Sequence, residues 1–146
     1  MSGNGSLPAI ALAQMEVWPG RPDLNVVRMK ELIVQARQAG AEVVAFPELC
    51  LSGYIIGDLW EVDSLVEDFA GYGDDIRAAS KGMTVIFGHI AIDREQIGED
   101  GRWRKYNAVY VCSDGRFVER PGIPQGLPPG THPKTLHPNY RFFDDD

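Results

Sequence analysis

Glu48 is the residue whose position most clearly suggests chemistry. It is separated only by Pro47 from the apolar run at residues 43–46. In an open α/β sheet, the loops after the strands surround the ligand crevice, and a carboxylate there is suited to general-base work. The alternative is a solvated glutamate in a turn, because acids beside prolines are common in turns. We therefore treat Glu48 as a candidate general base.

The other residue types that often do chemistry are scattered. Cys50 and Cys112 form no C-x-x-C pair, so neither a disulfide framework nor a zinc site is supported. His89 lies in an apolar segment, which favours a core histidine satisfied by hydrogen bonds. His132 and His137 lie in a proline-rich stretch and are too isolated to form a metal set. We predict no metal site.

Alternating strands and helices are expected to position Glu48. The pattern predicts strands at 8–14, 43–46, 83–92, 106–112 and 117–119, and helices at 23–39, 60–70 and 74–81. A strand–helix–strand order with short loops implies a right-handed crossover and parallel pairing. The second strand is predicted to be buried on both faces, because its apolar run does not alternate. Residues 121–138 hold six prolines and three glycines, which predicts loop or partly extended chain.

Length and composition exclude several classes of protein. With 146 residues and 44% hydrophobic content, the sequence predicts one compact domain. A net charge of −7 argues against nucleic-acid and anionic-membrane binding, which need a basic surface. No apolar run approaches the roughly 20 residues that span a bilayer, and the N-terminus lacks the basic segment of a signal peptide. We expect a soluble, cytoplasmic protein.

Two segments resemble motifs of the nitrilase (carbon–nitrogen hydrolase) superfamily. FPELCLSGYIIGDL, at residues 46–59, resembles the phrase F-P-E-L-x-x-x-G-Y that carries the catalytic glutamate. Its continuation into Asp-Leu is most similar to the glutaminase domain of glutamine-dependent NAD synthetases. KTLHPNYRFFDDD, at residues 134–146, resembles the K-T-H-L-P-N-Y-x-x-F-D-E segment of the same enzymes. The resemblance covers essentially the whole chain.

This resemblance implies roles for five residues. Glu48 would be the general base and Lys134 the cation that stabilises the negative oxygen developing on an amide substrate. Tyr54, Tyr140 and Phe143 would bind the substrate. Without the motifs, Lys134 would be interpreted as a solvated lysine, and Tyr54 and Phe143 as packing residues.

The sequence departs from the family pattern at the nucleophile. The family's catalytic cysteine follows the lysine, whereas this chain has no cysteine after Lys134. Cys50 would share a face with Glu48 in extended chain, but the family has a packing residue there. Cys112 has no base or lysine near it in sequence. Neither is predicted to be the nucleophile, so we expect the chain alone to be inactive.

The resemblance implies an α/β fold, a partial nitrilase-type αββα sandwich that is an incomplete four-layer domain. Residues 1–120 would form the N-terminal part of the carbon–nitrogen hydrolase domain. Residues 121–146 would be a Pro/Gly-rich loop with the lysine motif, where the domain is truncated. An incomplete sandwich exposes apolar sheet face, which favours a homo-oligomer or association with a complementary segment.

The implied function is that of a fragment of a glutamine-hydrolysing domain, which supplies ammonia for NAD biosynthesis in the complete enzyme. No cofactor is expected in this chain, because ATP would belong to the missing synthetase domain. One alternative is another carbon–nitrogen hydrolase, an amidase or carbamoylase acting on a small amide. A second is a non-catalytic remnant or binding module.

Overall fold

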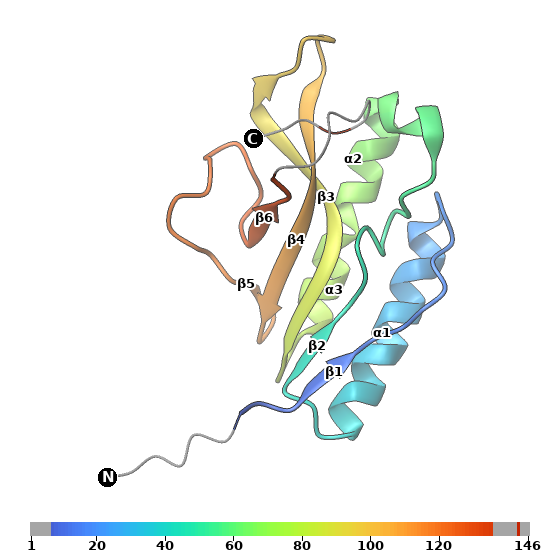
Figure 1. The fold of residues 1–146 in the computed structure, drawn as a ribbon, viewed down its shortest axis with the longest axis vertical. Coiled ribbons are helices and arrows are strands. Elements are labelled where there is room, and N and C mark those ends of the chain that lie inside the picture. The colour runs from blue at the N-terminus through green and yellow to red at the C-terminus, as the bar shows by residue number, and fades with distance from the viewer. Residues whose placement is uncertain (1–6, 136–142, 144–146) are drawn as a thin grey trace.

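The computed structural model describes residues 7–135 and residue 143, and its elements alternate along the chain (Figure 1). In order, they are β1 (Ile10–Leu12), α1 (Pro22–Gln38), β2 (Val43–Ala45), the 3-10 helix η1 (Gly57–Glu61), α2 (Asp63–Gly71), α3 (Gly73–Ala79), β3 (Thr84–Ile97), β4 (Trp103–Ser113), β5 (Arg116–Phe117) and β6 (Thr131–Pro133).

The strands form one mixed sheet in the order β1-β2-β3-β4-β5, with β6 paired to β4. The β1–β2 and β2–β3 pairs are parallel, as the strand–helix–strand pattern predicts. β3 and β4 form a long antiparallel hairpin. The three α-helices lie against one face of this sheet (Figure 1). The described residues therefore form two layers, one of strands and one of helices.

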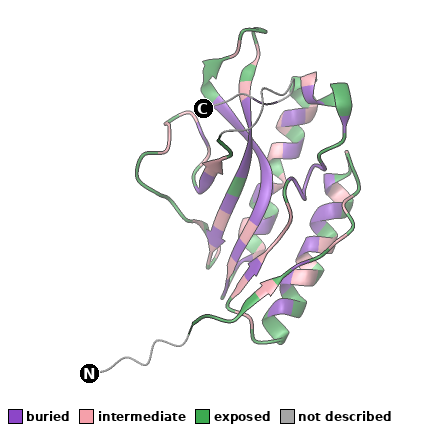
Figure 2. Cartoon of the chain, in the orientation of Figure 1, coloured by how far each residue is buried: buried purple, intermediate pink, exposed green. Residues whose placement is uncertain are grey.

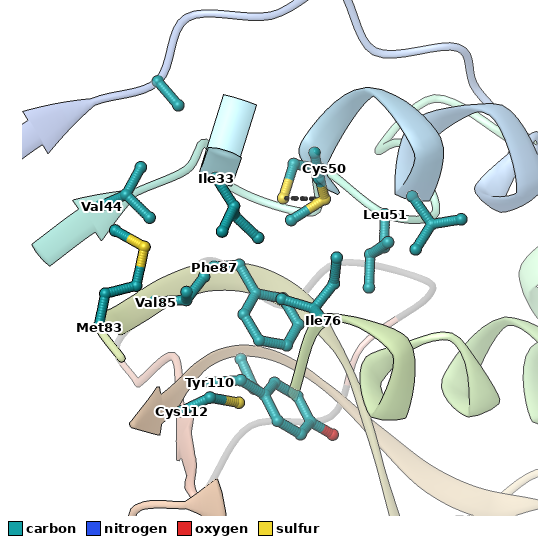
Figure 3. Close-up of a cluster of buried hydrophobic side chains, with 14 of the residues drawn as sticks. Ile33, Val44, Cys50, Leu51, Ile76, Met83, Val85, Phe87, Tyr110 and Cys112 are labelled. Carbon is teal, nitrogen blue, oxygen red and sulfur yellow. Dashed lines mark hydrogen bonds between the residues drawn. The ribbon is translucent and has the colours of Figure 1, made fainter. Parts of the chain in front are cut away.

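Helix α1 shows how the sequence builds the helical layer. Its buried apolar residues recur at spacings of three and four, at Val26, Met29, Ile33 and Ala36. Pro22 occupies the first turn, where its missing N–H costs no helical hydrogen bond. The four apolar residues belong to a core cluster with residues of the sheet, in which Figure 3 labels Ile33 beside Val44 and Phe87.

A second, smaller core cluster lies where β3 continues beyond the end of β2. It contains Leu49, Trp60, Phe69, Ile90 and Phe143. Trp60 and Phe69 meet edge to face, with their ring centroids 6.4 Å apart. Because Leu49 follows Glu48 directly, this cluster anchors the segment that carries the candidate base.

The sheet face opposite the helices is less covered (Figure 2). Val44 is buried, but its neighbours Val43 and Ala45 on the other face of β2 are only half-buried. On β1, Ile10 and Leu12 are 61% and 75% exposed. The prediction that the second strand is buried on both faces is therefore wrong, because the described helices cover only one face.

The proline-rich stretch contributes one short strand to the sheet edge. β6 pairs antiparallel with β4, which agrees with the predicted partly extended chain. Pro133 lies at the last position of β6, where its missing N–H interrupts no central ladder. In the part of the chain that the structure describes, no helix combines the length and apolar character needed to cross a membrane.

Candidate active site

Glu48 lies in the turn that follows β2, and this turn is held by β3. Phe46 donates its backbone N–H to the carbonyl of Ile86 over 2.8 Å, which extends the sheet pairing past the end of β2. The backbone then curls over Gly88, which donates its N–H to the carbonyl of Pro47 over 3.2 Å. The Gly88 carbonyl accepts the N–H of Cys50 at 3.1 Å. Glu48 is thus bracketed by two backbone hydrogen bonds to one residue of β3.

Gly88 is required by this close approach. A Cβ at Gly88 would lie 2.4 Å from Leu49 N, 2.6 Å from Glu48 Cα and 2.7 Å from Pro47 O, all of them backbone atoms. Leu49 itself has a φ of 45°, in the left-handed region that non-glycine residues seldom adopt. Such strained positions persist only where the surroundings enforce them. The turn therefore fixes the backbone from which the Glu48 side chain extends.

The far side of the turn is tied to the start of α1. The buried Asn25 donates its side-chain amide to the carbonyl of Leu51 over 2.8 Å and to that of Trp18 over 2.9 Å. Its Oδ1 accepts the N–H of Trp18 at 2.9 Å. One buried amide therefore joins the β1–α1 loop to the Glu48 turn.

Lys134 reaches the same place from the other end of the chain. Its backbone N–H continues the β6–β4 pairing by donating to the carbonyl of Asn107 over 2.7 Å. Its Nζ donates to Glu48 Oε1, also over 2.7 Å, although 86 residues separate the two in sequence. The side chains of Lys134 and Glu48 are 49% and 50% exposed. The two predicted catalytic residues therefore form one accessible ion pair.

The ion pair keeps the lysine charged. The hydrogen bond from Lys134 to the Glu48 carboxylate raises the pKa of the Lys134 ammonium above its ordinary value. Partial burial opposes this rise, and the electrostatic influence of Glu48 and Tyr54 adds to it. Lys134 is thus a permanent cation at neutral pH, as a group that stabilises a negative oxygen must be.

Asn107 is the third member of this arrangement. It is only 5% exposed, and its Nδ2 donates to Glu48 Oε1 over 2.5 Å. Asn107 was not predicted from the sequence. A signal was present, because Asn107 is an uncharged polar residue between two aromatic or apolar ones, Tyr106 and Ala108, in a strand whose neighbouring positions form the core.

Two of the three predicted substrate-binding residues, Tyr54 and Phe143, lie side by side. Tyr54 is 42% exposed, and its ring centroid is 6.1 Å from that of Phe143. Phe143 is buried, with its ring centroid 5.1 Å from that of Trp60. Tyr54 is therefore the surface member of an aromatic group, and Phe143 supports it from below. Tyr140 lies outside the described residues.

Both cysteines are core residues (Figure 3). The Cys50 thiol lies 3.7 Å from Met29 Sδ and 3.5 Å from the carbonyl oxygen of Gly88. Burial raises the pKa of Cys50 to about 12, and it raises the pKa of Cys112 to about 12 as well. A thiolate is the reactive form of cysteine, so neither residue suits the role of nucleophile.

His89 is also part of the core rather than of the site. It is fully buried, its Nε2 lies 3.3 Å from the carbonyl oxygen of Ala70, and its ring lies near those of Phe87 and Tyr110. Burial lowers its pKa to about 4, so the imidazole is neutral at physiological pH. His132 is half-buried, and His137 is outside the described residues. Among residues 7–135 and 143, no group of three or more His, Cys, Asp or Glu side chains could hold a metal ion.

The chain matches a known protein family over most of its length. A family model described as carbon–nitrogen hydrolase matches residues 9–120. A glutamine-dependent NAD(+) synthetase from Xylella fastidiosa (strain Temecula1 / ATCC 700964) is 33% identical over 137 residues, which is 93% of this chain and 22% of the relative. One from Thermotoga maritima is 28% identical over 138 residues, 93% of this chain and 20% of the relative. The chain spans about a fifth of the length of these curated relatives.

Solved structures share the fold. A glutamine-dependent NAD(+) synthetase from Cytophaga hutchinsonii superposes with a TM-score of 0.72 at 24% identity, covering 93% of this chain and 21% of that one. A mutant of the Nesterenkonia AN1 amidase, from the nitrilase superfamily, gives a TM-score of 0.72 at 17% identity, covering 99% of this chain and 50% of the amidase. The described sheet and helices therefore correspond to part of a larger fold.

Proposed function

Because the chain belongs to the carbon–nitrogen hydrolase family, we propose that it carries part of the active site of a glutamine-hydrolysing enzyme. In this proposal, Glu48 is the general base and Lys134 stabilises the negative oxygen of the intermediate. Glutamine is the proposed substrate because the curated relatives are glutamine-dependent NAD synthetases.

The contact between Glu48 and Lys134 carries the proposal. Lys134 Nζ and Glu48 Oε1 are 2.7 Å apart, and both side chains are half-exposed. Exposed ion pairs contribute roughly 0–1 kcal/mol to stability, so folding alone gives little reason to bring these two residues together. A carboxylate and an ammonium at one accessible point are the groups that amide hydrolysis needs.

The proposed reaction is acyl transfer to a thiol. Glu48 takes the proton of the thiol, and the sulfur forms a bond to the amide carbon of the substrate. The carbonyl oxygen becomes negative and is stabilised by the Lys134 ammonium. Glu48 then gives its proton to the amide nitrogen, the C–N bond breaks, and ammonia leaves with a thioester behind. Water cleaves the thioester to release glutamate and restore the thiol.

The thiol in this scheme comes from outside the 146 residues. The chain's two cysteines are buried in the core and have a pKa of about 12. We therefore propose that the chain alone releases no ammonia and that it works with a segment that supplies the nucleophile. The ammonia would pass to a synthetase region, where the ATP site would lie.

A chimera tests this proposal. This chain replaces the matching 137 residues of the Xylella fastidiosa synthetase, and NAD formation is measured with glutamine and, separately, with added ammonium. We expect Glu48→Gln and Lys134→Met to lower the glutamine-driven rate by roughly 100-fold or more, because each removes a group that acts on the reacting atoms. The ammonium-driven rate should stay unchanged, which shows that the synthetase region of the chimera is intact.

The matched control is Lys30→Met. Lys30 forms an exposed ion pair with Asp75 at 2.5 Å, but in helix α1, so its loss should leave both rates unchanged. A chimera whose glutamine-driven rate survives both site substitutions contradicts the proposal. Hydrolysis of another small amide, but not of glutamine, would instead assign the site to an amidase.

A further inference from the structure

We propose that Asn107 is a positioning residue that holds the Glu48 carboxylate in its charged, oriented state while Lys134 is engaged with the substrate. This inference rests on the proposed function for the roles of Glu48 and Lys134. It adds a residue that no motif in the sequence marks.

Asn107 is bonded to both members of the ion pair. Its side-chain Nδ2 donates to Glu48 Oε1 over 2.5 Å, and its backbone carbonyl oxygen accepts the backbone N–H of Lys134 at 2.7 Å. Glu48 Oε1 also accepts a hydrogen bond from Lys134 Nζ at 2.7 Å. A single residue of β4 therefore fixes the side chain of the base and the backbone from which the lysine extends.

The sheet register places Asn107 beside the backbone support of Glu48. Asn107 pairs with Ile90 of β3, and two positions further along β4, Val109 pairs with Gly88. Side chains two residues apart on a strand lie on the same face. Gly88 holds the backbone around Glu48, and Asn107 holds its carboxylate. These two residues are thus neighbours on the β3–β4 hairpin.

Burial distinguishes these two donors to Glu48. Asn107 is 5% exposed, whereas the side chain of Lys134 is 49% exposed and long enough to change its rotamer. In the proposed reaction, Lys134 must both hold Glu48 and bind the negative oxygen of the intermediate. When the lysine turns to that oxygen, a second donor must keep the carboxylate in place.

An amide is chemically suited to that task. It donates a hydrogen bond to the carboxylate, which favours the charged form. It does not titrate, so it cannot give Glu48 a proton and remove the base. The alternative is that Asn107 serves only to satisfy buried polar groups between β4 and β6. That structural role predicts no effect on the titration of Glu48.

Carboxyl NMR on the 146-residue chain separates the two roles. The protein is labelled with ¹³C-glutamate, the Glu48 signal is assigned by its absence in Glu48→Gln, and its titration midpoint is measured. We expect Asn107→Leu, which keeps the size but removes the donor, to raise this midpoint by roughly half to one pH unit. Asn107→Gln, which keeps an amide donor, should recover part of the shift. Val109→Leu, on the same strand and face, should leave the midpoint unchanged.

A measurement on the unsubstituted protein covers the case in which Asn107→Leu does not fold. The side-chain ¹⁵N–¹H₂ signals of Asn107 should move with pH at the same midpoint as the Glu48 carboxyl signal. This movement should vanish in Glu48→Gln. The inference would be overturned if the Asn107 side-chain signals did not move at the Glu48 titration midpoint. It would also be overturned if a folded Asn107→Leu chain had the same Glu48 midpoint as the unsubstituted protein. These NMR measurements need no turnover. A failure of the Asn107 inference can therefore be told apart from a failure of the proposed function, which would appear as the loss of glutamine hydrolysis in the chimera.

Discussion

A methyl group on Gly88 would lie 2.6 Å from the Cα of Glu48, so the strand of one and the turn of the other are in direct backbone contact. This contact sets the position of the candidate base, because two backbone hydrogen bonds to Gly88 bracket Glu48. The geometry of the site thus depends on a residue that carries no functional group.

Replacement of this glycine should displace the base. Gly88→Ala places Cβ within 2.4–2.7 Å of three backbone atoms, none of which can turn away as a side chain can. We expect a loss of roughly 1–3 kcal/mol in the free energy of unfolding, as overpacked cores show. Urea unfolding measures it. Gly71→Ala is the control, because nothing lies within 4 Å of a Cβ there, and it should be neutral or slightly stabilising.

Loss of the lysine should have little effect on stability. The side chain of Lys134 is 49% exposed, so Lys134→Met should change the free energy of unfolding by less than about 1 kcal/mol. Because Glu48 raises the pKa of Lys134, the pair's small contribution is present at neutral pH and is lost as the pH rises through the raised pKa of Lys134. Urea unfolding of this variant beside Lys30→Met tests it. A loss of several kcal/mol would show that Lys134 is a structural residue.

His89 should make the protein less stable in acid. Its pKa is about 4 in the folded chain against 6.5 for an ordinary histidine, because burial disfavours the imidazolium. Between those pH values the unfolded chain binds more protons, so stability falls as pH drops from 6.5 to about 4. The full effect is roughly 3 kcal/mol.

A non-titrating side chain isolates this effect. The difference in unfolding free energy between wild type and His89→Gln should shrink as pH falls through the same window. His132→Gln, at a half-buried position, should follow the wild-type curve much more closely. Parallel curves for wild type and His89→Gln would mean that His89 is not a neutral buried group.

The two thiols should be unreactive in the folded chain. With a pKa of about 12, Cys50 and Cys112 hold almost no thiolate near neutral pH, and both are buried. Iodoacetamide labelling followed by mass spectrometry should find neither modified until the chain is unfolded in urea. Rapid alkylation of either cysteine in the native protein would show that this residue is reactive enough to be the nucleophile.

Local sequence patterns predicted most of the fold. Apolar runs and helical spacing predicted the order of strands and helices, and the break between α2 and α3 falls at Tyr72, between the helices predicted at 60–70 and 74–81. The resemblance to the carbon–nitrogen hydrolases and the α/β fold class, as part of a nitrilase-type fold, are confirmed. The position of Glu48 in the turn after the second strand was also predicted, because only Pro47 separates it in sequence from the apolar run of that strand.

Features that depend on distant pairing were not visible in the sequence. The contact of Asn107 with Glu48 spans 59 residues and requires the β3–β4 register. The need for Gly88 arises only when another segment crosses it. The half-burial of Val43 and Ala45 depends on which face the helices cover, and an apolar run carries no information about that. The roles of Tyr54, Tyr140 and Phe143 in substrate binding stay predictions.

Zero-length cross-linking shows whether Glu48 and Lys134 are in contact in solution. A carbodiimide joins a carboxylate to an amine only where the two touch, and it forms an amide bond with loss of water. In the native chain we predict a cross-link between Glu48 and Lys134, detected by peptide mass spectrometry and absent in Glu48→Gln. The Lys30–Asp75 pair, 2.5 Å apart and similarly exposed, should link in every sample and serves as the internal standard. A chain that links Lys30 to Asp75 but never Glu48 to Lys134 would show that Glu48 and Lys134 do not form one site.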